Sequence, residues 1–217
     1  MTSRVLLVED DVPLRRSLTL ALRDEGFVVA EAGSGAEALA ALAGGPGAVV
    51  LDLGLPDVDG VELCARLRER TTSPILVHSV RRSSGDLART LDAGADDYLT
   101  KPFPVADLAA HLQALLTRPP LAPGLLDRQG LDADGVGRTA QGARVALTGT
   151  ELHLLAELVG RDGAAVPQHT LLRRVWALPP VAGRVVLDAR LRSLSAKLQA
   201  LGGAPVLTDH DGCRLPA

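Results

Sequence analysis

Residues 5–11, VLLVEDD, decide the fold class, because four apolar residues are followed directly by three acidic ones. A short apolar run of this kind is typical of a strand buried on both faces of a parallel sheet. Similar runs recur along the first half of the chain. We expect strands at 5–8, 27–30, 48–51, 75–77 and 98–99.

Segments with helical spacing separate these runs. In the first of them, Leu14, Leu18 and Leu22 recur every four residues, which gives a helix one buried stripe. In the second, Ser34 and Glu37 have the spacing of a capping box at a helix start. The alternation of strands and helices predicts an α/β fold with a five-stranded, doubly wound parallel sheet.

Charged side chains stand where several of the apolar runs end. Glu9 and Asp10 follow the first run, Asp52 follows the third, and Lys101 lies just past the fifth. Lys101 is one of only two lysines among 23 basic residues. A compact ammonium fits among carboxylates or phosphoryl oxygens where a planar guanidinium does not. Since ligands bind outside the carboxyl ends of such strands, we expect one chemical site there.

Composition excludes several protein classes. No stretch approaches the roughly 18 uncharged apolar residues of a membrane helix, and the early acidic residues argue against a signal peptide. Cys64 and Cys213 are too far apart in the sequence to suggest a metal cluster or a disulfide framework. We therefore expect a cytoplasmic protein that does not associate with a membrane.

The chain divides by charge at a proline-rich stretch, residues 117–124. Residues 1–118 carry 17 acidic and 12 basic side chains, whereas the remaining residues carry 9 and 11. This asymmetry predicts different partners for the two halves. We expect one domain at 1–118, a linker at 119–126 and a second domain at 127–217.

Four stretches of the first half occur in an order and at spacings that resemble the receiver domain of bacterial two-component response regulators. They are VLLVEDD (5–11), VVLDLGLPDVDG (49–60), PILVHS (74–79) and GADDYLTKPF (94–103). The resemblance covers residues 3 to about 118. It implies that Asp52 accepts a phosphoryl group from a sensor histidine kinase.

The resemblance also implies the rest of the phosphorylation site. Mg²⁺ would be held by Glu9, Asp10, Asp52 and the backbone carbonyl of Gly54, which agrees with the preference of Mg²⁺ for oxygen ligands. Lys101, followed by a cis peptide bond, would neutralise charge during phosphoryl transfer. A calcium site is the alternative, but the spacing is not that of an EF-hand and Lys101 would oppose it.

Further roles follow from position in the receiver pattern. Ser79 matches the hydroxyl that bonds a phosphoryl oxygen, and Tyr98 matches the aromatic residue that changes rotamer with it. Asp11 is expected to begin the first helix. Homodimerisation on activation would use a charged face of the fourth helix, fifth strand and fifth helix. Its members would be Arg89, Asp96, Asp97, Asp107 and His111, where histidine replaces an expected arginine.

The second half resembles the winged-helix output domain of the OmpR/PhoB class of response regulators. The resemblance rests on VALTGTELHLLAEL (145–158), TLLRRVW (170–176) and the run 184–198. We expect two short antiparallel strands at 130–139 and 143–147, and then three helices, the first opened by a Thr148–Glu151 capping box. This predicts an α+β domain that binds double-stranded DNA.

The third of these helices would enter the major groove, with Arg190 and Arg192 off its buried leucine stripe and in contact with a repeated DNA site. The full expected DNA-contacting set is Arg173, Arg174, Arg184, Arg190, Arg192 and Ser193. Departures from the family pattern predict weak binding: Ser193 and Ser195 occupy positions that are commonly basic, and the shortened wing carries Asp209 and Asp211.

These features predict a transcription regulator controlled by phosphorylation, without enzymatic activity toward an external substrate. Two alternatives stay open. The second domain could be a degenerate winged helix that binds a protein, or the chain could bind DNA independently of phosphorylation.

Overall fold

The computed structural model describes residues 3–81, 83–116, 126–132, 135–161, 163–176, 183–210 and 212–216. The chain forms two compact units whose boundary in the sequence lies between Thr117 and Arg118. The predicted linker at 119–126 lies outside the described residues except for Leu126. The two units are described separately below.

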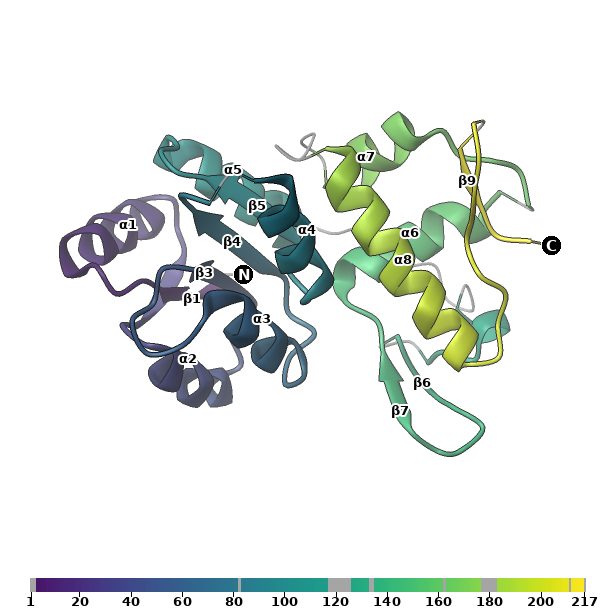
Figure 1. The fold of residues 1–217 in the computed structure, drawn as a ribbon, viewed down its shortest axis with the longest axis horizontal. Coiled ribbons are helices and arrows are strands. Elements are labelled where there is room, and N and C mark those ends of the chain that lie inside the picture. Colours follow the sequence, from purple (N-terminus) through teal and green to yellow (C-terminus); the bar gives the residue numbers. More distant parts are fainter. Residues whose placement is uncertain are drawn as a thin grey trace. The chain divides into compact units, whose positions relative to one another are not determined.

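The first unit contains one parallel sheet of five strands (Figure 1). In sequence order they are β1 (Arg4–Val8), β2 (Val28–Ala32), β3 (Ala48–Asp52), β4 (Ile75–Ser79) and β5 (Asp97–Thr100). Their spatial order is β2-β1-β3-β4-β5, so the direction of winding reverses between β1 and β3. The carboxyl ends of β1 and β3 therefore flank the crevice in which such sheets bind ligands. The predicted fold class and all five strands are confirmed.

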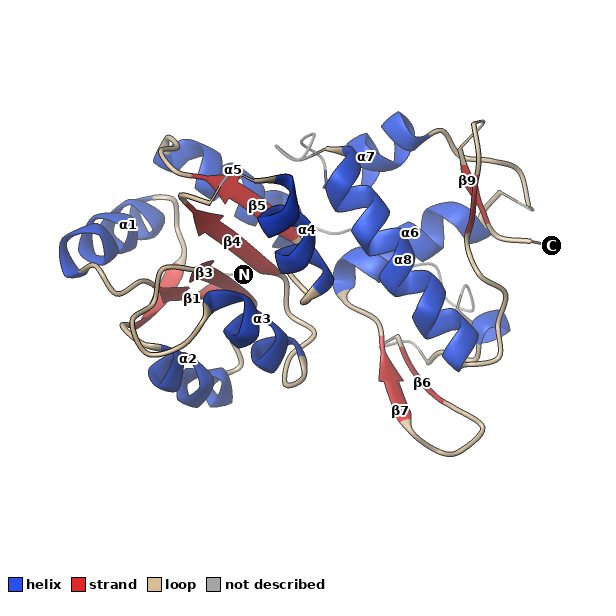
Figure 2. Ribbon diagram, in the orientation of Figure 1, coloured by secondary structure: helices blue, strands red, loops and turns tan. Residues whose placement is uncertain are grey.

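Among the residues that the structure describes in this unit, five α-helices and one short 3₁₀ helix accompany the sheet and lie over both of its faces (Figure 2). They are α1 (Val12–Asp24), α2 (Gly35–Ala41), η1 (Leu42–Gly44), α3 (Gly60–Arg68), α4 (Ser84–Asp92) and α5 (Val105–Leu116). Helix α1 packs beside α5, while α2 packs beside α3 and α3 beside α4.

The helix starts follow the local sequence. Asp11 is the N-cap of α1, and its Oδ1 accepts a hydrogen bond from the Leu14 backbone nitrogen at 2.8 Å, as predicted. At α2, Ser34 Oγ accepts from the Glu37 nitrogen, but the Glu37 carboxylate bonds the Gly33 nitrogen. Only half of the predicted capping box forms at α2, because the carboxylate reaches one residue further back.

The second unit contains three α-helices and two small antiparallel hairpins among its described residues. In order the elements are η2 (Asp127–Gln129), β6 (Val136–Arg138), β7 (Arg144–Ala146), α6 (Gly149–Val159), α7 (Gln168–Trp176), α8 (Arg184–Ala200), β8 (Leu207–Thr208) and β9 (Cys213–Arg214). This arrangement is compatible with the predicted winged-helix domain. The complete capping box of Thr148 and Glu151 opens α6.

The core of the second unit is built around α8. Leu187, Leu194 and Leu198 are fully buried on this helix, and Trp176 of α7 is buried with them in the same unit. The predicted leucine stripe of α8 therefore faces inward. Among the described helices of both units, none has the length and apolar character needed to cross a membrane.

Candidate functional site

The carboxyl ends of the strands bring Glu9, Asp52 and Lys101 together. Lys101 Nζ donates hydrogen bonds to Glu9 Oε2 and to Asp52 Oδ2, both at 2.9 Å. Both carboxylates are almost fully buried, and the Lys101–Pro102 peptide bond is cis. We predicted from the sequence that these three residues lie close together. Glu9 and Lys101 are 92 positions apart in the chain.

Charge and burial set the protonation of this cluster. Burial alone would raise the pKa of Asp52, but its hydrogen bond to the Lys101 ammonium and that positive charge lower the pKa overall. For Glu9 burial dominates, and the neighbouring charge of Asp52 adds to it, so its pKa is raised despite Lys101. Burial opposes the charge of Lys101, but hydrogen bonds to the two carboxylates raise its pKa overall. Asp52 is therefore an ionised carboxylate at neutral pH.

The β1–α1 loop holds the remaining predicted acidic ligand. Asp10 is exposed, and Arg15 of α1 donates from Nη1 to the backbone carbonyls of both Glu9 and Asp10. Gly54 follows β3, and its backbone N–H bonds the Asp52 carboxylate. The donor set of carboxylates at this sheet edge suits a hard divalent cation. Asp10 does not belong to the group of possible ligand atoms that lie within 4.8 Å of one another in the described part of the chain, which consists of Glu9, Asp52 and His78.

His78 is the site residue that we did not predict. It pairs with Asp52 in the β3–β4 register, and its side chain is 0% exposed. Its Nδ1 lies 3.9 Å from Glu9 Oε2, and its ring meets Phe103 edge to face. Burial, assisted by the charge of Lys101, lowers its pKa to about 3. The signal in the sequence was a histidine inside an otherwise apolar run, directly before Ser79.

The two predicted switch residues lie next to this cluster. Ser79 ends β4, and its Oγ accepts a hydrogen bond from the Arg81 nitrogen at 3.2 Å. Tyr98 in β5 is buried, and its hydroxyl donates to the Arg81 carbonyl at 2.7 Å. Burial raises the pKa of Tyr98. Both side chains therefore bond the backbone of Arg81, which links them through one short segment.

Three members of the predicted charged dimer face are buried inside the first unit, so the expectation that they present charge at its surface is wrong. Asp96 Oδ2 accepts a hydrogen bond from Arg68 Nη2 at 2.6 Å, and Asp97 Oδ2 lies 2.6 Å from His111 Nδ1. A buried charge needs a partner, and both aspartates find one within the unit. The other two members of that set are exposed: Arg89 and Asp107.

Arg190 is buried as well, and its predicted place on the DNA-facing surface of α8 is wrong. Its side chain is 1% exposed, and Nη1 lies 4.0 Å from Glu151 Oε1 of α6. Position 190 comes three residues after Leu187 and four before Leu194, which puts it on the buried face of the helix. We had placed Arg190 off the buried leucine stripe, whereas the structure shows that it lies on the same face as those leucines.

Glu151 gathers several polar partners in this core. It accepts hydrogen bonds from Ser193 Oγ and Lys197 Nζ, both at 2.6 Å, and from the Thr148 nitrogen at 2.8 Å. The hydroxyl of Ser193, which we expected to contact DNA, is therefore engaged inside the unit. Four arginines of the predicted set remain exposed: Arg173, Arg174, Arg184 and Arg192.

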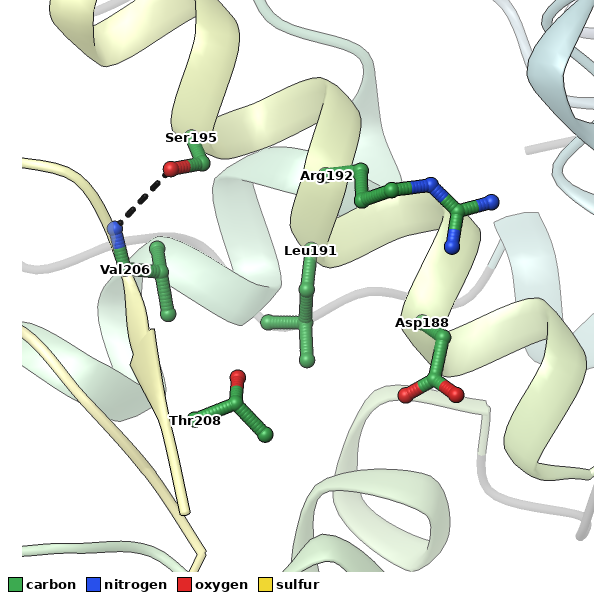
Figure 3. A pocket seen from close by; sticks show the side chains of 6 residues that line it. All are labelled: Asp188, Leu191, Arg192, Ser195, Val206 and Thr208. Carbon is green, nitrogen blue, oxygen red and sulfur yellow. Dashed lines mark hydrogen bonds between the residues drawn. The ribbon is translucent and has the colours of Figure 1, made fainter.

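A shallow groove of about 260 Å³ separates α8 from β8 (Figure 3). Arg192 extends outward from α8 at this groove, and Ser195 Oγ accepts a hydrogen bond from the Val206 nitrogen at 3.1 Å.

In the β8–β9 hairpin, Arg214 Nη1 pairs with Asp209 Oδ2 at 3.0 Å. This pairing reduces the repulsion that we expected between Asp209 and DNA phosphates, while Asp211 lies outside the described residues.

Comparison with known proteins agrees with this geometry. The family "Response regulator receiver domain" matches residues 5–113, half of the chain. The transcriptional regulatory protein CseB of Streptomyces avermitilis is 36% identical over 214 residues, covering 90% of this chain and 91% of that protein. PrrA of Mycobacterium tuberculosis is 40% identical over 212 residues, covering 94% and 91%. The chain belongs to the OmpR/PhoB family of response regulators.

Solved structures resemble the receiver half of this response regulator. A two-component response regulator from Clostridium difficile matches 54% of this chain and 98% of its own, with 28% identity and a TM-score of 0.53. The activated receiver domain of RstA from Klebsiella pneumoniae matches 54% and 100%, with 31% identity and a TM-score of 0.51. Both support the receiver fold assigned above.

The buried Asp97–His111 pair predicts a pH-dependent stability of this response regulator. Burial alone would lower the pKa of His111, but the hydrogen bond and charge of Asp97, with the charge of Asp107, raise it overall. The pair's contribution is therefore complete below the unfolded pKa of about 6.5 and is lost as the pH rises through the folded-state pKa. We expect His111→Gln to destabilise the receiver most at low pH.

Urea unfolding of wild type and His111→Gln, followed by circular dichroism between pH 5.5 and 9, measures this difference. The exposed His169, replaced in the same way, serves as the control and should give no such pH-dependent loss. A destabilisation by His111→Gln that is constant across this range would show that the ion pair does not form.

Proposed function

We propose that this response regulator is phosphorylated on Asp52 by a sensor histidine kinase, with Mg²⁺, and thereby controls its own dimerisation and DNA binding as a transcription regulator. The observation that carries the proposal is the direct bonding of Lys101 to both Asp52 and Glu9. Several relatives are named transcriptional regulatory proteins, which supports the proposed role in regulating transcription.

Asp52, Lys101 and Ser79 each have a different role in the proposed phosphoryl transfer. An Asp52 carboxylate oxygen attacks phosphorus, forming the new O–P bond while the P–N bond to the kinase histidine breaks. Lys101 places a positive charge where the transferred oxygens develop negative charge. The Ser79 hydroxyl, at the carboxyl end of β4, would donate a hydrogen bond to one of these oxygens. Mg²⁺, bound by Glu9, Asp10, Asp52 and the Gly54 carbonyl, would supply further neutralisation.

For the output we propose that α8 enters the major groove of DNA. Arg192 is exposed on this helix, and Arg184 at its start is exposed but lies 3.6 Å from Asp188. Arginine side chains in the major groove bond guanine edges or phosphates. The exposed Arg173 and Arg174 of α7 add positive charge in the same unit.

A second candidate is a protein-interaction role for the second unit. The burial of Arg190 and the internal bond of Ser193 favour it, because they remove two of the expected DNA contacts from α8.

Binding to genomic DNA fragments decides between the two roles. The fragments are tested in gel shifts at low and moderate salt, with and without beryllofluoride and Mg²⁺.

Sequence-selective binding that falls with salt and is strengthened by beryllofluoride supports the proposal. Selective binding that is indifferent to beryllofluoride would replace it with regulation independent of phosphorylation. No binding even at low salt would favour a protein partner.

Arg192→Ala tests the proposed contact surface. If Arg192 binds a phosphate, the slope of log affinity against log salt should fall by about 0.9; if it reads a base, the loss should be about 1–3 kcal/mol at that position. Arg144→Ala, which removes an exposed arginine of β7, is the control and should change neither quantity. Equal affinities of wild type and Arg192→Ala at every salt concentration would place the DNA surface elsewhere.

A further inference from the structure

The phosphorylation site contains a nitrogen donor in addition to its carboxylates. One ligand atom each from Glu9, Asp52 and His78 lies within 4.8 Å of the others, and all three residues are buried. Neither ring nitrogen of His78 has a hydrogen-bond partner among the described residues. A buried polar group normally has such a partner, so this imidazole is suited to a ligand that the protein chain itself does not provide.

The spacing of these atoms fits one metal ion after small side-chain movements. Two ligands on opposite sides of an ion lie about 4.2 Å apart when each bond is about 2.1 Å long. The Lys101 ammonium already bonds one oxygen of each of the two carboxylates, which shows that positive charge is accommodated between them. The flexible stem of a lysine allows the ammonium to turn aside when a second cation enters.

The identity of the donors determines which ion the site prefers. Mg²⁺ is bound almost entirely through oxygen atoms, whereas imidazole nitrogen favours borderline transition ions such as Co²⁺ and Zn²⁺. Phe103 meets the His78 ring edge to face, and the preceding Val77 is buried. Glu9 Oε2 lies 3.9 Å from Nδ1, which is beyond hydrogen-bond distance. An ion held between His78 and the two carboxylates would therefore give the ring the bonding partner that it lacks among the described residues.

We propose that His78 is a nitrogen ligand at the Asp52 metal site and shifts the preference of this response regulator from Mg²⁺ toward borderline divalent transition ions. This inference rests on the proposed metal-dependent phosphorylation of Asp52. It concerns which ion the site selects, and Mg²⁺ still binds there through the oxygen ligands.

Calorimetric titration of the full-length protein with Co²⁺ and with Mg²⁺ tests the preference. His78→Leu replaces the imidazole with an apolar side chain. We expect it to weaken Co²⁺ binding at least about tenfold, since even residues that only support a ligand have effects of this size. Mg²⁺ affinity should change by less than about twofold because its ligands are oxygens. Retained Mg²⁺ binding also shows that the variant site is folded.

Pulsed electron paramagnetic resonance of the Mn²⁺-loaded protein provides a direct readout. The wild type should show nitrogen hyperfine coupling from an imidazole, and His78→Leu should lack it. The double variant His169→Gln/His210→Gln excludes a contribution from the two histidines beside the β8–β9 hairpin and should keep the coupling.

The outcomes separate the two proposals. An unchanged ratio of Co²⁺ to Mg²⁺ affinity in His78→Leu, or no nitrogen coupling in the wild type, would overturn the role of His78. Loss of both ions in His78→Leu would also overturn it, because the residue would then be structural. Failure of the wild type to bind either ion would instead contradict the metal-dependent phosphorylation on which the inference rests.

Discussion

Replacing Lys101 with methionine is expected to slow phosphorylation by a small phosphodonor such as acetyl phosphate at least about 100-fold, the usual effect of removing one group that stabilises developing charge. Methionine keeps much of the aliphatic stem but removes the ammonium that bonds Asp52 and Glu9 at 2.9 Å. Two buried carboxylates then face each other without a counter-charge, and the approach of an anionic donor becomes unfavourable. Intact-mass spectrometry over time measures the rate.

Two further variants separate the effect of the Lys101 ammonium from the effects of positive charge alone. Lys101→Arg restores the positive charge but not the compact shape, so we expect it to remain slow. Arg70→Met removes a cation from an exposed position of the same unit and should leave the rate unchanged. Normal phosphorylation of Lys101→Met would show that the lysine only stabilises the fold at this site.

Replacing Glu151 with alanine is expected to lower the free energy of unfolding of the second unit by about 3–5 kcal/mol, as for a broken buried ion pair. Glu151 is fully buried and accepts hydrogen bonds from Lys197, Ser193 and the Thr148 nitrogen. Its removal also leaves the buried Arg190 without this neighbouring negative charge. Denaturant unfolding followed by tryptophan fluorescence measures the change, since Trp176 is the only tryptophan and lies in this unit.

Glu157→Ala is the matched control for Glu151→Ala. Glu157 is on the same helix and pairs with Arg174 at 2.9 Å, but both side chains are partly exposed. Exposed pairs contribute about 0–1 kcal/mol, so this variant should unfold almost like the wild type. Similar losses in the two glutamate variants would mean that the buried network contributes no more than a surface pair.

The sequence predicted the receiver fold because its signals are strong and local. Runs such as Val5–Val8 are apolar on both faces, which is expected only for a strand in the middle of a sandwiched sheet. The same reasoning brought Asp52 and Lys101 together, since topology places the ends of parallel strands at one edge. The meeting of these residues depends on strand order more than on the details of packing.

What the sequence did not predict depends on three-dimensional packing. Arg190 and Asp97 looked like surface charges, yet each is buried opposite a specific partner, Glu151 or His111. The helical spacing of Arg190 is consistent with burial, but each pair joins residues on different elements, so spacing along the chain does not reveal the partner. His78 was missed for a related reason: a histidine in a strand is ordinary until the register places it beside Asp52.

Identification of the phosphorylated residue tests the central claim most directly. Wild type, Asp52→Asn and Asp59→Asn are incubated with acetyl phosphate and Mg²⁺ and measured by intact-mass and peptide mass spectrometry. Asp59 is the exposed N-cap of α3, a position where asparagine caps as well as aspartate, so its variant is a folded control. We predict one added phosphoryl group, on Asp52, in wild type and Asp59→Asn and none in Asp52→Asn. A phosphoryl group that persists in Asp52→Asn, or is absent from the wild type, would contradict the account.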